Sequence, residues 1–83
     1  MHVVKNLSQL ESELLVRIGN RFKVLRLKAG YKSYEGFALE HNLDRKQYWR
    51  VENGSNVTMV TIVRLLQIHQ VSFEEFFREI EKG

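Results

Sequence analysis

The chain contains no cysteine, and for a chain of only 83 residues this absence is the strongest constraint on the fold. A domain of this size buries a thin core, and without disulfides or thiolate-bound metals packed apolar side chains must hold it together. Proline, which is common at turns and strand edges, is also absent. We therefore expect one compact helical domain, either stable alone or stabilised by a partner subunit.

Hydrophobic spacing and helix-start signals predict five short helices. A residue with a capping side chain precedes each of them: Ser8, Ser33, Asp44, Thr58 and Ser72. The first helix has an apolar stripe with steps of three or four residues: Leu10, Leu14, Ile18, Phe22 and Leu25. Gly30, Asn42 and Gly54 are expected to end the first three helices, because glycine and asparagine accept the left-handed conformation. The predicted fold class is all-α.

Both ends of the chain carry more large apolar residues than a thin helix usually buries. The last predicted helix has four among eight residues: Phe73, Phe76, Phe77 and Ile80. We expect Phe73 and Phe77 to close the core, and the exposed remainder to form a dimer seam. The first helix raises the same question through four leucines: Leu7, Leu10, Leu14 and Leu15. The sequence therefore predicts a homodimer that uses at least one of these ends.

Charge is distributed unevenly along the chain, whose net charge is +3. Residues 17–50 contain nine lysines and arginines against three carboxylates, whereas residues 51–83 contain three against five. A basic segment between acidic ends indicates a surface that faces a polyanion, although an ordinary solvated surface would give the same count.

The second and third predicted helices are separated by little more than Asn42 and Leu43. Two short helices joined by so tight a turn form a helix-turn-helix unit, in which the third helix projects its first turn outward. Its outward residues are rich in hydrogen-bond donors: Arg45, Lys46, Gln47, Trp49 and Arg50. Arginine can bind guanine and glutamine can bind adenine with two hydrogen bonds each, so this helix is suited to the major groove of DNA.

Five short motifs follow one another in a fixed order: Ile18-Gly19, Leu25-Arg26, Ser33 to Ala38, Tyr48 to Gly54 and His69 to Ser72. In this order residues 18–73, about two-thirds of the chain, resemble the Cro/C1-type helix-turn-helix domain of phage repressors and xenobiotic-response-element regulators. The resemblance implies a five-helix, lambda-repressor-like DNA-binding domain over residues 17–83. Residues 1–16 would then be an N-terminal extension that continues into the first helix.

The resemblance also implies a set of DNA-contacting residues: Ser33, Tyr34, Arg45, Lys46, Gln47, Trp49, Arg50, Asn53, Ser55 and Asn56. Family members have glutamine at the position of Tyr34 and commonly a small polar residue at that of Trp49, so base preference is expected to differ here. The loop that begins at Asn53 would hold phosphates. Arg26 and Glu52 match an ion pair that joins the first and third helices.

Signals for other activities are weak. His2, His41 and His69 have no metal-binding spacing, and the latter two are expected at helix C-termini, where positive charge is favourable. No nucleophile motif or phosphate loop is present, so we expect neither catalysis nor a metal or cofactor. The longest apolar runs are at most four residues and no signal peptide is recognisable, so we expect a cytoplasmic protein without a membrane span.

Together these patterns predict a sequence-specific regulator of transcription that binds a two-fold operator in double-stranded DNA as a homodimer. The alternative is a protein-interaction module, or an antitoxin-like protein with a partner protein, built on the same fold. Trp49 and Tyr34 would be its anchors, because tryptophan and tyrosine are frequent hot spots in protein interfaces.

Overall fold

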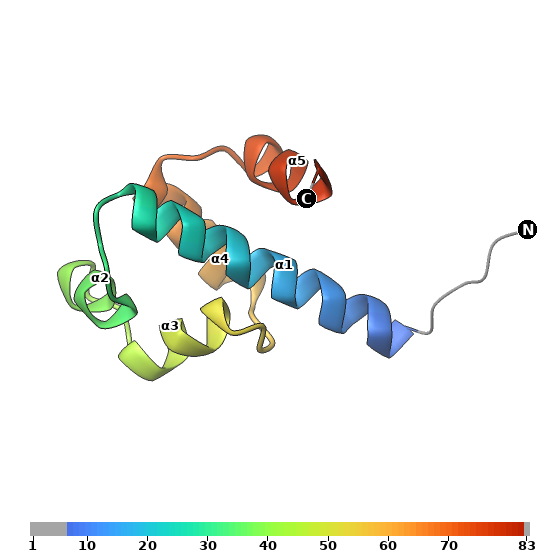
Figure 1. Cartoon of the computed structure of the whole chain (residues 1–83), viewed down its shortest axis with the longest axis horizontal. Coiled ribbons are helices and arrows are strands. Elements are labelled where there is room, and N and C mark those ends of the chain that lie inside the picture. The colour runs from blue at the N-terminus through green and yellow to red at the C-terminus, as the bar shows by residue number, and fades with distance from the viewer. Residues whose placement is uncertain (1–6, 83) are drawn as a thin grey trace, which may run out of the picture.

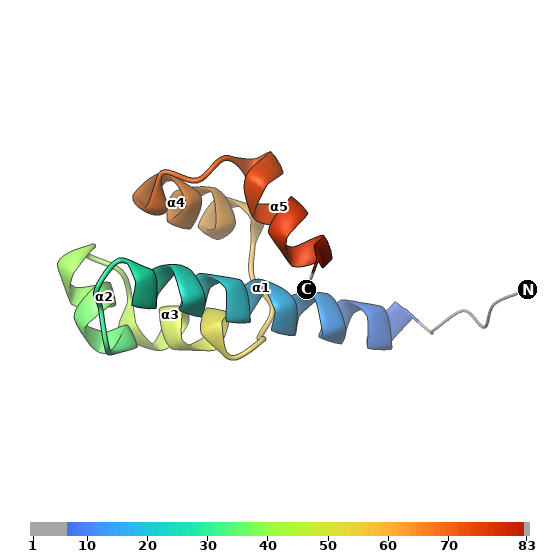
Figure 2. The ribbon, with the colours of Figure 1, turned by 45° about the horizontal axis from the view of Figure 1, so that its top comes forward.

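A long first helix forms the axis of the molecule, and four shorter helices pack around one half of it (Figure 1). The computed structural model describes residues 7–82, which contain five helices and no strand. The helices are α1 (Leu7–Lys28), α2 (Tyr34–Glu40), α3 (Arg45–Glu52), α4 (Met59–His69) and α5 (Phe73–Lys82). Figure 2 shows α2 and α3 on one side of α1, with α4 and α5 on the other. The predicted all-α, five-helix fold is confirmed.

Local capping explains where four of the helices begin. In each, a side-chain oxygen accepts a hydrogen bond from the backbone N–H three residues later: Ser33 at 3.0 Å, Asp44 at 2.8 Å, Thr58 at 3.2 Å and Ser72 at 3.0 Å. The cap predicted at Ser8 is wrong, because α1 already begins at Leu7 and Ser8 lies inside its first turn. Gly30, Asn42 and Gly54 have positive φ angles of 97°, 58° and 83° after the first three helices, as predicted.

The core lies where α1 meets the other four helices, and it contains eleven buried residues: Ile18, Phe22, Phe37, Ala38, Tyr48, Val51, Ile62, Leu65, Leu66, Phe76 and Ile80. Leu10 and Leu14 continue the same stripe of α1 but are exposed, because the N-terminal half of α1 projects beyond the other helices (Figures 1 and 2). The predicted core role of Phe73 is wrong. Its side chain is 52% exposed, and Phe76 takes its place inside.

Gly19 sets the distance between α1 and the C-terminal end of α3. A Cβ atom at this position would lie 2.4 Å from the carbonyl oxygen of Val51 and 2.7 Å from that of Glu52. Both atoms belong to the backbone of α3, so they cannot move aside as a flexible side chain would. Only glycine therefore permits this close packing, which fixes α3 against the long helix.

A buried ion pair is the second link between α1 and α3. Arg26 donates from Nε to Glu52 Oε2 at 2.7 Å and from Nη2 to Oε1 at 3.1 Å, and its Nη1 donates to the carbonyl oxygen of Tyr31 at 2.9 Å. The Tyr48 hydroxyl donates to the same carboxylate. The hydrogen bond with Glu52 raises the pKa of Arg26. The pKa of Tyr48 is also raised, mainly by burial and secondly by its hydrogen bond with Glu52. The predicted pair is confirmed.

The partly buried ring of His69, in the last turn of α4, packs against aromatic side chains of the core. Its ring stacks on Phe37 with centroids 5.1 Å apart and an interplanar angle of 6°, and it lies 6.4 Å from the ring of Phe22. Burial, and secondarily the nearby His41, lowers the pKa of His69. The neutral imidazole is therefore favoured, which corrects the expected role in positive-charge capping.

Candidate nucleic-acid interface

The turn between α2 and α3 determines which face of α3 reaches solvent. The backbone N–H of Leu43 donates to the carbonyl oxygen of Ala38 at 2.8 Å, and Asn42 adopts its left-handed conformation between them. Ala38 is buried, and its small side chain lets α3 approach α2 closely. Tyr48 and Val51 face the core from α3. The opposite face of α3 is consequently exposed to solvent, and the buried contacts fix its orientation.

All five α3 residues predicted for the groove lie on that exposed face: Arg45, Lys46, Gln47, Trp49 and Arg50. Four of them line a hollow between α2 and α3 together with Tyr34, which partly packs against the core. Gln47 is exposed but lies outside the lining of the hollow. The structure thus brings five of the predicted residues together on one surface.

Glu35 is a member of this surface that sequence reasoning missed. It lines the same hollow, and its Oε2 lies 3.5 Å from Nη1 of Arg45. Both side chains are more than half exposed, so the pair orients the guanidinium but adds little stability. The two residues belong to different helices and are ten positions apart, so no helical spacing rule could have paired them.

Residues at the two ends of the α2–α3 unit complete the exposed set. Ser33 accepts the capping bond at its Oγ, which leaves the hydroxyl hydrogen available to a ligand. Beyond α3, Asn53, Ser55 and Asn56 are exposed in the loop that leads to α4. Gly54 allows this loop to lie against α1, because a Cβ atom there would be 3.0 Å from the side chain of Val16.

The amides of this loop are less available than the resemblance implies. The backbone N–H of Asn53 donates to the carbonyl oxygen of Trp49 at 3.1 Å, and that of Ser55 donates to the carbonyl oxygen of Arg50 at 2.9 Å. The Asn53 side chain also donates one of its two amide hydrogens to Trp49, at 2.9 Å. These two residues can therefore reach a phosphate only through their side chains.

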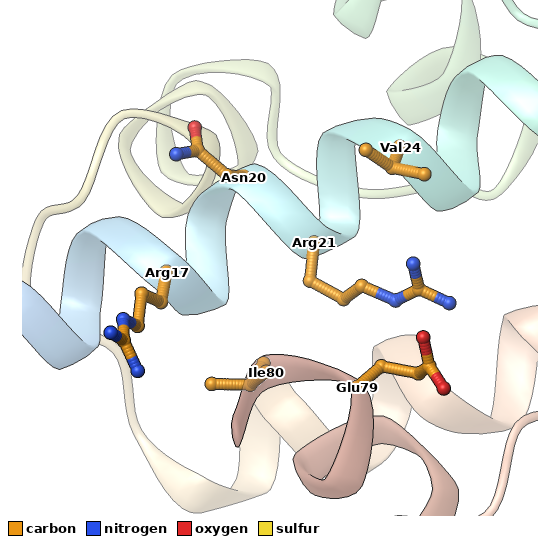
Figure 3. A pocket seen from close by; sticks show the side chains of 6 residues that line it. All are labelled: Arg17, Asn20, Arg21, Val24, Glu79 and Ile80. Carbon is orange, nitrogen blue, oxygen red and sulfur yellow. The ribbon is translucent and has the colours of Figure 1, made fainter. Parts of the chain in front are cut away.

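A different hollow lies between α1 and α5 (Figure 3). It measures about 200 Å³, and Figure 3 shows the Arg21 guanidinium lying toward the Glu79 carboxylate across it. The neighbouring Lys82, which bonds to Glu79 at 3.2 Å, lowers the pKa of this carboxyl. Residues 7–82 contain no cluster of three or more side chains suited to a metal, and none of the helices they form is long and apolar enough to cross a membrane.

Comparison with known proteins adds to this geometry, although no family model matches the sequence. The control protein C.MunI of Mycoplasma sp is 35% identical over 72 residues, which are 86% of this chain and 97% of that protein. The crystal structure of the wild-type restriction-modification controller protein C.Esp1396I has 30% identity and a TM-score of 0.70, covering 83% of this chain and 90% of the other. The C.Esp1396I tetramer in complex with its natural 35 base-pair operator has a TM-score of 0.69 at the same identity, covering 83% of this chain and 91% of the other.

The five-helix fold and the donor-rich outer face of α3 define a Cro/C1-type helix-turn-helix regulator of transcription that binds DNA. Within this class, the chain belongs to the restriction-modification controller proteins.

Proposed function

We propose that this protein acts as a homodimer that inserts one α3 helix per subunit into successive major grooves of a two-fold operator, and so controls transcription of restriction-modification genes in the cytoplasm. The observation that carries the proposal is the exposed face of α3, where three cations and an amide surround Trp49 while the opposite face is buried. C.Esp1396I, with 30% identity, forms a tetramer on its 35 base-pair operator, which supports an oligomeric mode of binding. The proposed mechanism is occupancy of promoter DNA without a catalytic step or a cofactor.

Nine of the ten predicted residues divide into two groups in this proposal. Arg45, Lys46 and Gln47 occupy the first turn of α3 and would meet base edges first, because the start of a recognition helix points into the groove. Arg50 lies one turn further along the same face. A second group would hold the sugar-phosphate backbone and set the register of the helix: Ser33, Asn53, Ser55, Asn56 and the hydroxyl of Tyr34.

The dimer interface is proposed to use α4 and α5. Four exposed apolar side chains lie on these two helices beside the half-buried Phe77: Met59, Val60 and Val63 on α4, and Phe73 on α5. The rings of Phe73 and Phe77 lie 4.6 Å apart and form one apolar surface. Burial of such a surface against a second copy would remove its unfavourable exposure to water.

Phe73→Ser is therefore expected to shift the protein from dimer to monomer at micromolar concentration, because it removes the most exposed ring of this surface. Sedimentation velocity would measure the shift. Leu14→Ser is the matched control, since Leu14 is exposed to a similar degree on the projecting half of α1. A monomer produced by Leu14→Ser and not by Phe73→Ser would move the interface to α1.

The DNA-binding mode is tested with the duplex that the wild-type protein selects from a randomised pool. We expect an inverted repeat with half-sites about 34 Å apart. Arg50→Ala should weaken binding of this duplex by about 1–3 kcal/mol and relax the preference at one position in each half-site. Asn53→Ala should weaken all duplexes by a similar factor and leave the specific-to-random ratio nearly unchanged.

Quantitative binding to a panel of single-base variants separates these effects, with melting curves to show that both proteins remain folded. Equal loss on every duplex for Arg50→Ala would make Arg50 a phosphate contact. Unchanged DNA binding for both variants would remove α3 from the groove and favour a protein-interaction module with Trp49 and Tyr34 as anchors.

A further inference from the structure

The hollow between α2 and α3 combines an apolar patch with a cationic rim. It measures about 460 Å³ and is lined by two residues of α2 and four of α3: Tyr34, Glu35, Arg45, Lys46, Trp49 and Arg50. Trp49 is 46% exposed, while Tyr34 is half-buried and fixed by its packing against the core. Two aromatic side chains therefore form an apolar patch within a surface that otherwise consists of three cations and one carboxylate.

The Trp49 side chain has no partner within the described part of the chain. Its indole ring contacts no other aromatic ring and its N–H donates no hydrogen bond there. Exposure of an indole ring to water is unfavourable, and a ligand that covers the ring gains the free energy of burying it. A ligand for this hollow consequently has to supply apolar surface at its centre.

The cations around the hollow restrict what that ligand is. An apolar protein surface placed here would bury Lys46 and Arg50 without an acidic partner, which is unfavourable. Duplex DNA supplies phosphates and base acceptors for the cations. In its major groove it also offers one kind of apolar group, the 5-methyl group of thymine. The cations and the apolar patch of the hollow therefore both fit duplex DNA.

We propose that this hollow reads pyrimidine 5-methyl groups, with the rings of Tyr34 and Trp49 covering the methyl carbon while the surrounding cations hold the DNA. The inference rests on the proposed function, since it needs α3 in the major groove. Glu35 orients Arg45 at the rim of the hollow through their contact at 3.5 Å. Thymine and 5-methylcytosine carry the methyl group at the same ring position, so both are candidate sources.

Removal of the methyl group alone gives a direct test. The duplex selected by the wild-type protein is synthesised again with deoxyuridine replacing thymine at one position at a time, which leaves the pairing edge unchanged. We expect one position in each half-site where the loss of the methyl group weakens binding about fourfold, and about fifteenfold when both half-sites are changed. In the second arm, cytosine and 5-methylcytosine are compared at that position, and the methylated base is expected to bind about fourfold more tightly.

Variants of the protein assign the effect to the hollow. Trp49→Ala should bind the thymine and uracil duplexes equally, whereas Trp49→Phe should retain part of the difference because it keeps an aromatic face. Leu39→Ala is the matched control: Leu39 is an exposed apolar residue of α2 that does not line the hollow, so the difference should stay intact. Melting curves show whether each variant is folded.

Three results would overturn the inference. If no thymine-to-uracil change alters affinity while Arg50→Ala still changes base preference, α3 lies in the groove but the hollow reads no methyl group. If Trp49→Ala keeps both the affinity and the thymine preference, the aromatic patch belongs to a protein surface. If no duplex is enriched from the pool, the proposed function fails together with the inference.

Discussion

Replacement of Glu52 by alanine is expected to destabilise the protein by about 3–5 kcal/mol, because it leaves the Arg26 guanidinium buried without its counterion. Arg26 is only 4% exposed, and both of its hydrogen bonds to Glu52 would be lost, along with the bond from Tyr48. Domains of this size have total stabilities of roughly 5–15 kcal/mol, so the variant should lose much of its stability. The melting temperature should fall by about 15 °C or more.

Two further variants show whether the buried charge is the cause. Arg26→Met combined with Glu52→Leu should recover a large part of the lost stability, since paired apolar replacements of a buried ion pair are often tolerated. Glu74→Ala breaks the ion pair between Glu74 and Arg78 on the surface of α5 and should melt close to wild type. The explanation fails if Glu52→Ala melts with the wild type, or if the double variant is the less stable of the two.

The local part of the fold was predictable because its signals lie within a few residues. A capping side chain acts on an amide three positions away, and a positive φ angle selects glycine or asparagine at one position, so Ser33, Asp44 and Gly54 could be identified directly. The Arg26–Glu52 pair spans 26 positions, and only the resemblance to the Cro/C1-type family indicated it.

Errors arose where the outcome depends on tertiary packing. In α5, apolar residues at positions 73, 76, 77 and 80 form a stripe so wide that periodicity alone cannot locate its centre. The structure places Phe76 and Ile80 at the centre, so Phe73 is left outside. Leu14 shares the apolar spacing of α1 but is 50% exposed, because it lies on the half of α1 that projects beyond the other helices.

The part of the candidate interface on α3 could be predicted from the sequence, whereas the hollow between α2 and α3 could not. Exposure of the outer α3 residues follows from burial of Tyr48 and Val51 three positions apart, which fixes the orientation of the helix. The hollow between α2 and α3 depends on the angle of the intervening turn and on the contact of Glu35 with Arg45. The assignment of individual residues to bases or phosphates stays a prediction, as does the domain boundary at residue 16.

Binding to duplex DNA is expected to weaken by a factor of about 10³–10⁵ between 50 and 200 mM salt. Arg45, Lys46 and Arg50 lie on the face proposed to meet DNA, where each would neutralise a neighbouring phosphate in addition to any bond with a base edge. With further cations of the basic segment 17–50, a dimer would make roughly six to ten such phosphate contacts. Each contact releases a condensed counterion and contributes about −0.9 to the slope of log K against log salt concentration. Titration of a random duplex by fluorescence anisotropy would measure a slope of about −5 to −9.

Two substitutions with the same charge change distinguish phosphate contacts from net charge. Lys46→Gln should reduce the magnitude of the slope by about 2, which is one contact in each subunit of a dimer. Arg78→Gln should leave the slope unchanged, because Arg78 is an exposed residue of α5, on the opposite side of α1 from α3, where it pairs with Glu74 at 2.9 Å. Equal reductions for both variants would attribute the salt dependence to overall charge, and a slope near zero at measurable affinity would contradict electrostatic binding through α3.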